Sequence, residues 1–184
     1  VVEGEGAWST VDGEKCPMKR GDLILTPTGL WHEHGHDGDK PVVWLDVLDL
    51  PLVYYMEASY HVNGGRQRTL PGHGERAYAR GGVVPTPVFA RSAKPYPMLR
   101  YPWADARAAL ESLAADQPQL DAVQVTYTNP ETGAHAENIL GFYALMQQRH
   151  RPEVQAVLAS LAELLAGDED FADVVEIIRK AGGR

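Results

Sequence analysis

Short apolar segments separated by turn residues occupy the first 53 residues and limit the folds that the chain can adopt. Gly, Asp and Pro interrupt this region roughly every ten residues, and Asp12-Gly13 has the composition of a two-residue hairpin turn. The predicted strands cover residues 7–11, 14–18, 23–25, 31–36 and 42–48. Short strands at this spacing predict a β-sandwich or barrel over residues 1–53.

Beyond residue 53 the composition changes three times. Residues 54–102 are rich in Gly, Pro and Arg, which predicts an irregular connector on the surface. Residues 103–148 have the pattern of a helix followed by strands, and residues 149–184 have the periodicity of two amphipathic helices. The helix is predicted at 103–115 and a strand at 122–127, and residues 139–146 have a mixed pattern that is strand-like at first. The expected fold is mainly β with added helices, ending in a C-terminal helical hairpin. The two amphipathic helices are expected to pack on their own domain, with binding to a partner as the alternative.

Charge and cysteine content argue against several classes of function. The 184 residues carry a formal net charge of −8, which disfavours nucleic acid or an anionic membrane as a partner. No apolar run approaches the roughly 20 residues of a membrane span. The single cysteine, Cys16, stands in a polar stretch and is interpreted as structural, and one cysteine suits a reducing, cytoplasmic location. The chain starts at Val1 inside an apolar run, from which we expect further sequence upstream.

Three of the seven histidines, His32, His34 and His36, stand at alternate positions of one predicted strand. Alternate residues of a strand point to the same face, so the three imidazoles are expected on one side. Neutral imidazole is the commonest metal ligand. The pattern therefore indicates either a metal site or a polar strand edge that faces water. His61 and His73 stand alone in the connector, which favours solvation.

The residues before the first histidine have a distinctive spacing. Gly21, Pro27, Gly29 and His32 follow one another as in the second cupin motif, G-x5-P-x-G-x2-H-x3-N. His36 stands where that motif has Asn. The Gly and Pro residues bend the chain tightly, so that the following strand aims its first imidazole into a barrel.

Residues 1–53 resemble the first cupin of gentisate 1,2-dioxygenases and their salicylate and 1-hydroxy-2-naphthoate dioxygenase relatives. The resemblance rests on VVEGEG, TVDGE, GDLILTP, WHxHG and WLDxLDxPLV, which occur here in the family's order. It is weaker over residues 95–148 and ends near residue 149. It implies a partial cupin barrel, which is a double-stranded β-helix or jelly roll. Residues 1–53 would form the C-terminal part of a first barrel, and residues 103–148 would lead to a second.

The resemblance also implies a site that binds Fe(II). His32 would be the third ligand of the iron, completing a face with two histidines upstream of Val1. His34 and Asp46 would be catalytic residues, and His34 and Trp31 would bind the substrate. An arginine that binds the substrate carboxylate in the family would also lie upstream. Trp31 and Trp44 would line or support the pocket, but for each of them the residues alone favour a plain core tryptophan.

The activity implied is ring cleavage by O2 of gentisate or a related hydroxylated aromatic carboxylate, in a homo-oligomer. The product would be a ring-opened keto acid, which is maleylpyruvate when the substrate is gentisate. Two alternatives remain open from the residues alone. One is a non-catalytic cupin scaffold, or a small-molecule-binding chain that lacks a complete metal site. The other is a metal-dependent isomerase or epimerase on the same barrel, because fold alone does not decide function.

Overall fold

The computed structural model describes residues 1–70, 74–86, 96–148 and 160. The strands are β1 (Ala7–Val11), β2 (Glu14–Pro17), β3 (Leu23–Ile24), β4 (His32–His36), β5 (Arg100–Tyr101), β6 (Ala122–Thr126) and β7 (Tyr143–Gln147). The helices are α1 (Leu50–Tyr55), α2 (Gly74–Ala77) and α3 (Trp103–Asp116). The helical hairpin predicted at 149–184 lies outside the described residues. Among the residues described, no helix has both the length and the apolar character needed to cross a membrane.

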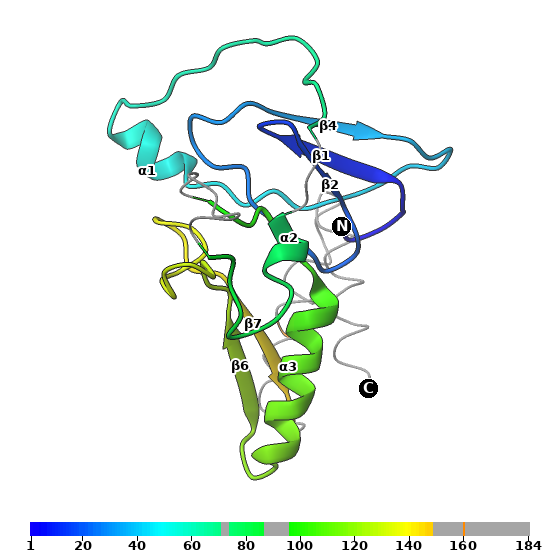
Figure 1. The fold of residues 1–184 in the computed structure, drawn as a ribbon, viewed down its shortest axis with the longest axis vertical. Helices are drawn as coiled ribbons and strands as arrows, with labels where there is room; N and C mark the ends of the chain where they lie inside the picture. Colours follow the sequence, from blue (N-terminus) through cyan, green and yellow to red (C-terminus); the bar gives the residue numbers. More distant parts are fainter. Residues whose placement is uncertain (71–73, 87–95, 149–159, 161–184) are drawn as a thin grey trace.

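The first sheet has the order β2-β1-β4 and forms the upper part of Figure 1. The hairpin predicted at Asp12-Gly13 is confirmed, and both residues have positive φ, 46° and 84°. This geometry matches the right-handed twist of the two flanking strands. β4 pairs antiparallel with β1 and places His34 opposite Ser9. The histidine strand therefore lies at one edge of a sheet whose centre is β1.

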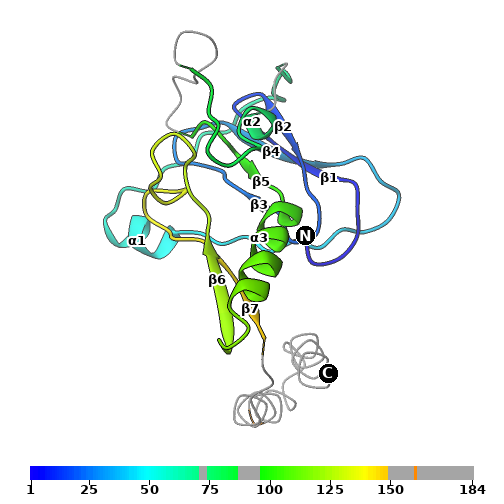
Figure 2. The same cartoon turned by 60° about the horizontal axis from the view of Figure 1, so that its bottom comes forward.

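Two further pairs of strands complete the described part of the fold. β3 pairs with β5, and β6 pairs with β7, both antiparallel. α3 packs on the β6–β7 pair through Leu110, which is fully buried, against Val123 and Ala144. Figure 1 shows these three elements side by side below the first sheet, and Figure 2 shows β3 and β5 between the two regions. The predicted helix at 103–115 and the strand at 122–127 are confirmed.

The long strand predicted at 42–48 is wrong. Only Val43 pairs, in an isolated bridge with Glu3, and the chain then continues without regular structure to α1. A strand needs a neighbour for its backbone groups, and residues 44–48 find none among the described residues. Leu45 is accordingly 75% exposed. The helix α1 was not expected, although Asp49 and Pro51 give it a recognisable start.

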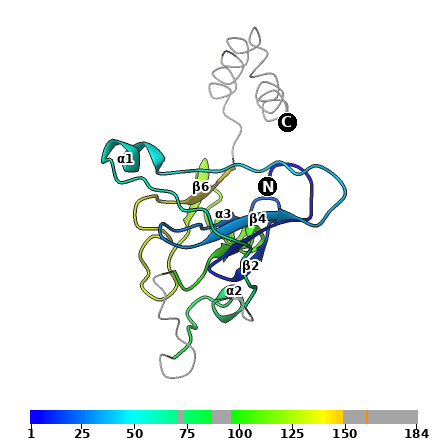
Figure 3. The ribbon, with the colours of Figure 1, turned by 90° about the horizontal axis from the view of Figure 1, so that it is seen from above.

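The described part of the 54–102 segment packs back on the first hairpin. The side-chain amide of Gln67 donates to Thr10 O at 2.9 Å and its oxygen accepts from Gly13 N at 2.8 Å. Further along, Gly74 N donates to a carboxylate oxygen of Glu14 at 3.0 Å. Figure 3 shows the segment running from α1 to the side of the sheet where β2 and α2 lie. Residues 67–74 are therefore attached to β1 and β2 mainly by side-chain contacts, whereas β5, near the end of the segment, pairs with β3.

Candidate functional site

The three histidines lie on the exposed face of β4. His32, His34 and His36 are exposed, whereas the intervening residues of the strand are partly buried. The rings of His32 and His34 meet edge to face, with their centroids 5.8 Å apart. His36 turns toward the preceding loop, where its Nε2 donates to Glu5 O at 3.2 Å. The first two imidazoles therefore remain on the open face, and the third is held by backbone.

His34 has the most closely defined surroundings of the three. Its Nδ1 lies 2.8 Å from Oγ of Ser9, the residue directly opposite on β1. The Trp44 ring lies against its other side, with centroids 5.8 Å apart. Burial lowers the pKa of His34, while the nearby Asp46 carboxylate raises it and His32 lowers it further. Because burial dominates, the imidazole of His34 is neutral at pH 7.

A cavity of about 520 Å³ contains His34 and Asp46 in its lining, together with Ser9 and Trp44. Its opposite wall comes from far along the chain, from the start of α3, the end of β6 and the start of β7. These residues are Trp103, Tyr127, Phe142, Tyr143, Ala144 and Leu145. The structure therefore brings together the two residues predicted to be catalytic. It also places aromatic groups around them.

His32 and Trp31 line a neighbouring cavity of about 430 Å³ instead. The far wall of this cavity is formed by α1 and residues 58–62. Trp31 is 52% exposed, so the expectation of a plain core tryptophan is wrong for this residue. The structure separates Trp31 from the cavity of His34 and Asp46. Thr26 lines both cavities, and the ring contact of His32 with His34 joins a residue of one cavity to a residue of the other.

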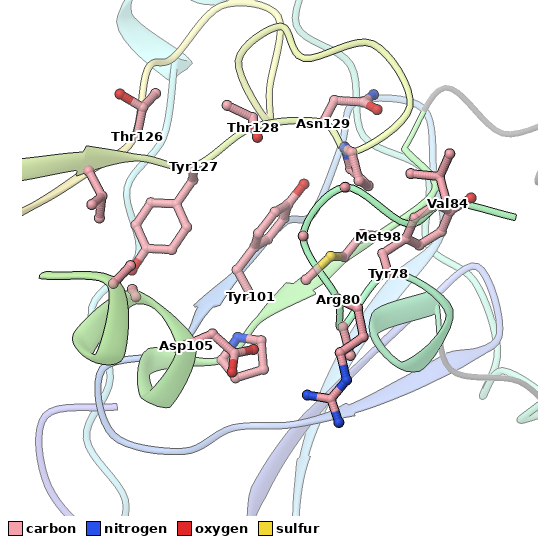
Figure 4. Close-up of a pocket in the computed structure, with 18 of the residues that line it drawn as sticks. Tyr78, Arg80, Val84, Met98, Tyr101, Asp105, Thr126, Tyr127, Thr128 and Asn129 are labelled. Atoms are coloured by element: carbon pink, nitrogen blue, oxygen red, sulfur yellow. The ribbon is translucent and has the colours of Figure 1, made fainter. Parts of the chain in front are cut away.

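A third cavity of about 500 Å³ lies between α3, residues 78–84 and residues 125–130, and contains no histidine. Figure 4 shows Tyr101 in this cavity between Tyr127 and Met98. The rings of Tyr101 and Tyr127 meet edge to face, with centroids 5.8 Å apart. Burial raises the pKa of Tyr101 to about 12, so this phenol stays protonated at pH 7. Tyr127 lines both this cavity and that of His34.

Comparison with known proteins identifies the chain. A family model described as a cupin domain matches residues 1–48. A gentisate 1,2-dioxygenase of Ralstonia sp is 79% identical over 146 residues, which cover 79% of this chain and 41% of that protein. This chain belongs to the gentisate 1,2-dioxygenase family. A second relative in that family, gentisate 1,2 dioxygenase 1 of Aquipseudomonas alcaligenes, is 35% identical over 83% of this chain and 46% of its own length.

A solved structure agrees with this assignment to the gentisate 1,2-dioxygenase family. The salicylate 1,2-dioxygenase of Pseudoaminobacter salicylatoxidans, in its adduct with gentisate, matches with a TM-score of 0.63 and 30% identity. The match covers 78% of this chain and 42% of that one. The partial cupin fold expected from the sequence is thereby confirmed. The chain spans less than half the length of the relatives that it matches.

The donor set of the described residues fits one ligand of a metal site, as the family resemblance implies. His32 presents an exposed imidazole whose only hydrogen-bond contact there is a long one, from Nδ1 to Leu30 O at 3.5 Å. No group of three His, Cys, Asp or Glu side chains able to hold a metal occurs within the described ranges. His61, which lines the cavity of His32, is bonded to the side chain of Asn63. A complete ligand set therefore requires groups beyond the residues described.

Sequence reasoning missed Ser9 and the aromatic wall. The hairpin turn and the alternation of β1 were visible in the sequence, but the register that sets Ser9 opposite His34 was not. Trp103 and Tyr127 join the cavity through the packing of α3 and β6, for which no motif gives a signal. Their only sequence signal is position, because Trp103 begins α3 and Tyr127 directly follows β6.

Proposed function

We propose that this chain carries part of the active site of an iron-dependent dioxygenase for gentisate or a related hydroxylated aromatic carboxylate. The proposal rests on the shared cavity of His34 and Asp46, in a chain 79% identical to a gentisate 1,2-dioxygenase. The reaction adds both atoms of O2 and breaks the ring bond between the carboxylate-bearing and hydroxyl-bearing carbons. Gentisate would give maleylpyruvate.

His32 is the proposed iron ligand, acting with two further histidines outside the described residues. Bound Fe(II) would supply a redox-active Lewis acid to which both substrate and O2 have access. The exposed position of His32 on β4 supports this role, because its imidazole is not consumed by a short hydrogen bond within the described part. We leave His36 outside the proposed ligand set, because it stands where the cupin motif has Asn; its Nε2 donates to Glu5 O.

His34 and Asp46 are proposed to remove the proton of the phenolic hydroxyl. A deprotonated phenol is more electron-rich and therefore reacts more readily with O2, so a base beside the hydroxyl accelerates the reaction. The His34 ring would accept the proton, and the Asp46 carboxylate, whose charge acts on that ring, would stabilise the imidazolium. Trp31 and His34 are the residues proposed to contact the substrate, although they line neighbouring cavities, and the Trp44 ring lies against that of His34.

The proposal extends to a cytoplasmic location and a homo-oligomer. The single cysteine, Cys16, is free and buried, as suits a reducing compartment. Large exposed apolar side chains between residues 43 and 60 support burial against another chain or another part of the same one.

A metal-free, small-molecule-binding cupin is the second candidate. It is favoured by one observation, that the described residues do not gather three metal-binding side chains at one point. Such a protein would use the same cavity of about 520 Å³ and its aromatic wall to bind an aromatic acid without turnover.

Iron content and O2 uptake together separate the two candidates. The full chain is reconstituted with Fe(II) without oxygen, its iron is measured by mass spectrometry, and O2 uptake is followed with gentisate, salicylate and 1-hydroxy-2-naphthoate. Ring cleavage predicts about one iron per chain and uptake equimolar with substrate. If the chain only binds the substrate, calorimetry should detect heat from gentisate binding while no O2 is consumed. That result would overturn the proposed activity.

A further inference from the structure

We propose that Ser9 is the positioning residue of His34: it holds Nδ1 of the ring so that Nε2 is the nitrogen offered to the substrate. The inference rests on the proposed function for its kinetic consequence and on the described geometry for its structural part. Ser9 lines the same cavity as His34, and its side chain contacts the ring of that histidine. It acts only through His34.

The fold delivers Ser9 to this position by strand register. Ser9 is in the central strand β1, directly opposite His34 of the edge strand β4. Opposite residues of an antiparallel pair point to the same face, with side chains in contact. Oγ of Ser9 consequently lies 2.8 Å from Nδ1 of His34. A shift of one residue in this pairing would put Ser9 and His34 on different faces.

Burial makes the hydroxyl of Ser9 costly unless it is bonded. Ser9 is only 1% exposed, and a buried hydroxyl without a partner is destabilising. Its Oγ has two contacts, one with His34 and one with Sδ of Met18, to which it donates at 3.5 Å. A thioether sulfur has no hydrogen to give. With the hydroxyl proton of Ser9 directed at Sδ of Met18, Oγ is available as an acceptor, and we assign the proton of the 2.8 Å contact to Nδ1 of His34.

These two hydrogen bonds, from His34 Nδ1–H to Ser9 Oγ and from the Ser9 hydroxyl to Met18 Sδ, determine which nitrogen of the imidazole is protonated. When Nδ1 of a neutral imidazole carries the proton, Nε2 carries the lone pair. The His34 ring has three neighbours: the Trp44 ring lies against it, the His32 ring meets it edge to face, and Ser9 is hydrogen-bonded to its Nδ1. Nε2 is left as a fixed acceptor on the cavity side, where Asp46 also lies.

Kinetics of the Fe(II)-loaded full chain test the inference through a double-mutant cycle. Ser9→Ala is expected to lower kcat for gentisate roughly 10-fold or more, the usual effect of losing a group that orients a site residue. The KM and the iron content should stay near their original values. Ser9→Thr keeps the hydroxyl and should restore most of kcat. In a His34→Gln background Ser9→Ala should have no further effect.

Thr10→Val is the matched control. Thr10 is equally buried on the same strand, but it lies opposite Glu33 on the other face of the sheet. Its loss of a hydroxyl should leave kcat unchanged. If Ser9→Ala lowers kcat equally with and without His34, or not at all, Ser9 does not act through the histidine and the inference is wrong.

A spectroscopic measurement keeps the structural part testable even if the Ser9 variants fold poorly. Nitrogen-15 NMR of the wild-type full chain, with diamagnetic Zn(II) in place of iron, distinguishes a protonated Nδ1 from a protonated Nε2. We expect the His34 signals of the Nδ1–H form. The Nε2–H form would overturn the inference. Absence of gentisate turnover in the wild type would instead reject the proposed function and leave this test intact.

Discussion

Arg100 donates from Nε to a carboxylate oxygen of Asp22 across 2.7 Å, although 78 residues separate the two in sequence. Both side chains are buried, with 8% and 4% of their surfaces exposed. The second oxygen of Asp22 accepts from the backbone N–H of Trp103, at the first turn of α3. One carboxylate thus joins the turn before β3 to both β5 and α3. Since Asp22 also lines the cavity of His34, the same contact supports one wall of the candidate site.

Replacing Asp22 by Asn is expected to destabilise the protein strongly. The change leaves Arg100 with Glu75 as its remaining carboxylate partner, at 2.9 Å, and weakens the acceptor for Trp103 N. Removing one partner of a buried ion pair costs about 3 kcal/mol or more in the free energy of unfolding. Urea unfolding monitored by tryptophan fluorescence measures this loss.

The exposed pair of Arg107 and Glu111 provides the control. These residues are separated by one helical turn of α3, and both side chains are more than half exposed. Glu111→Gln should change the unfolding free energy by less than about 0.5 kcal/mol. Similar losses from both substitutions would contradict a special role for the buried pair.

Gly35→Ala is predicted to disturb the histidine strand. A Cβ at Gly35 would overlap the ring of Trp8, the residue opposite it on β1. The ring must then move, and overpacking of this kind costs roughly 1–3 kcal/mol. Thermal unfolding measures the cost. Gly65→Ala is the control, because a Cβ there meets no atom within 4 Å, and its melting temperature should stay close to that of the wild type.

Two histidine substitutions should separate iron binding from turnover. His32→Ala is expected to abolish binding of iron, because it removes the proposed ligand. His34→Gln is expected to keep the iron but to lower kcat roughly 100-fold or more, as removal of a general base does. Iron analysis and O2 uptake on the same samples measure both effects. Iron retained by the His32 variant would contradict the role of His32 as a ligand, and full turnover by the His34 variant would contradict the role of His34 as a base.

Cys16 is predicted to be unreactive in the folded protein. Burial, followed by the charges of Glu14 and Glu75, raises the pKa of its thiol to about 12. The thiolate is the reactive form, so iodoacetamide at pH 8 should modify the native protein at least about 100-fold more slowly than the protein in urea. Mass spectrometry follows the reaction. Equal rates would show that β2 opens readily.

The same pKa shift gives a direction for stability at alkaline pH. Below about pH 8 the Cys16 thiol is protonated in both the folded and unfolded states. Between about pH 9 and 12 the Cys16 thiol ionises in the unfolded chain but stays protonated in the folded one, which favours unfolding. Stability should therefore fall as the pH rises through this range, and less so in Cys16→Ala.

Local signals in the sequence predicted the elements that depend on local chemistry. The hairpin follows from Asp12-Gly13, because these residues tolerate positive φ, and α3 follows from the spacing of its apolar residues around Leu110. The alternation of β4 likewise predicted the common face of its histidines. In each case the physical cause lies within a few residues of its effect.

Pairing over long distances could not be predicted in this way. The segment 42–48 has the composition of a strand, but strand formation also requires a partner, which the described residues provide only at Val43. The contacts of Asp22 with Arg100 and of Ser9 with His34 depend on how separate strands meet. The separation of Trp31 from the cavity of His34 has the same origin, because it depends on the course of the chain around α1.

The position of β4 at the edge of its sheet has a consequence for substrate selection. Within the described residues its outer backbone groups pair with no strand, while its inner ones pair with β1. A strand added along that edge would point every second side chain to the face that carries His32 and His34. Such a neighbour would line the face next to the proposed site histidines. The histidines and the side chains that contact an aromatic acid would then belong to adjacent strands, and specificity would diverge without any change in the histidines themselves.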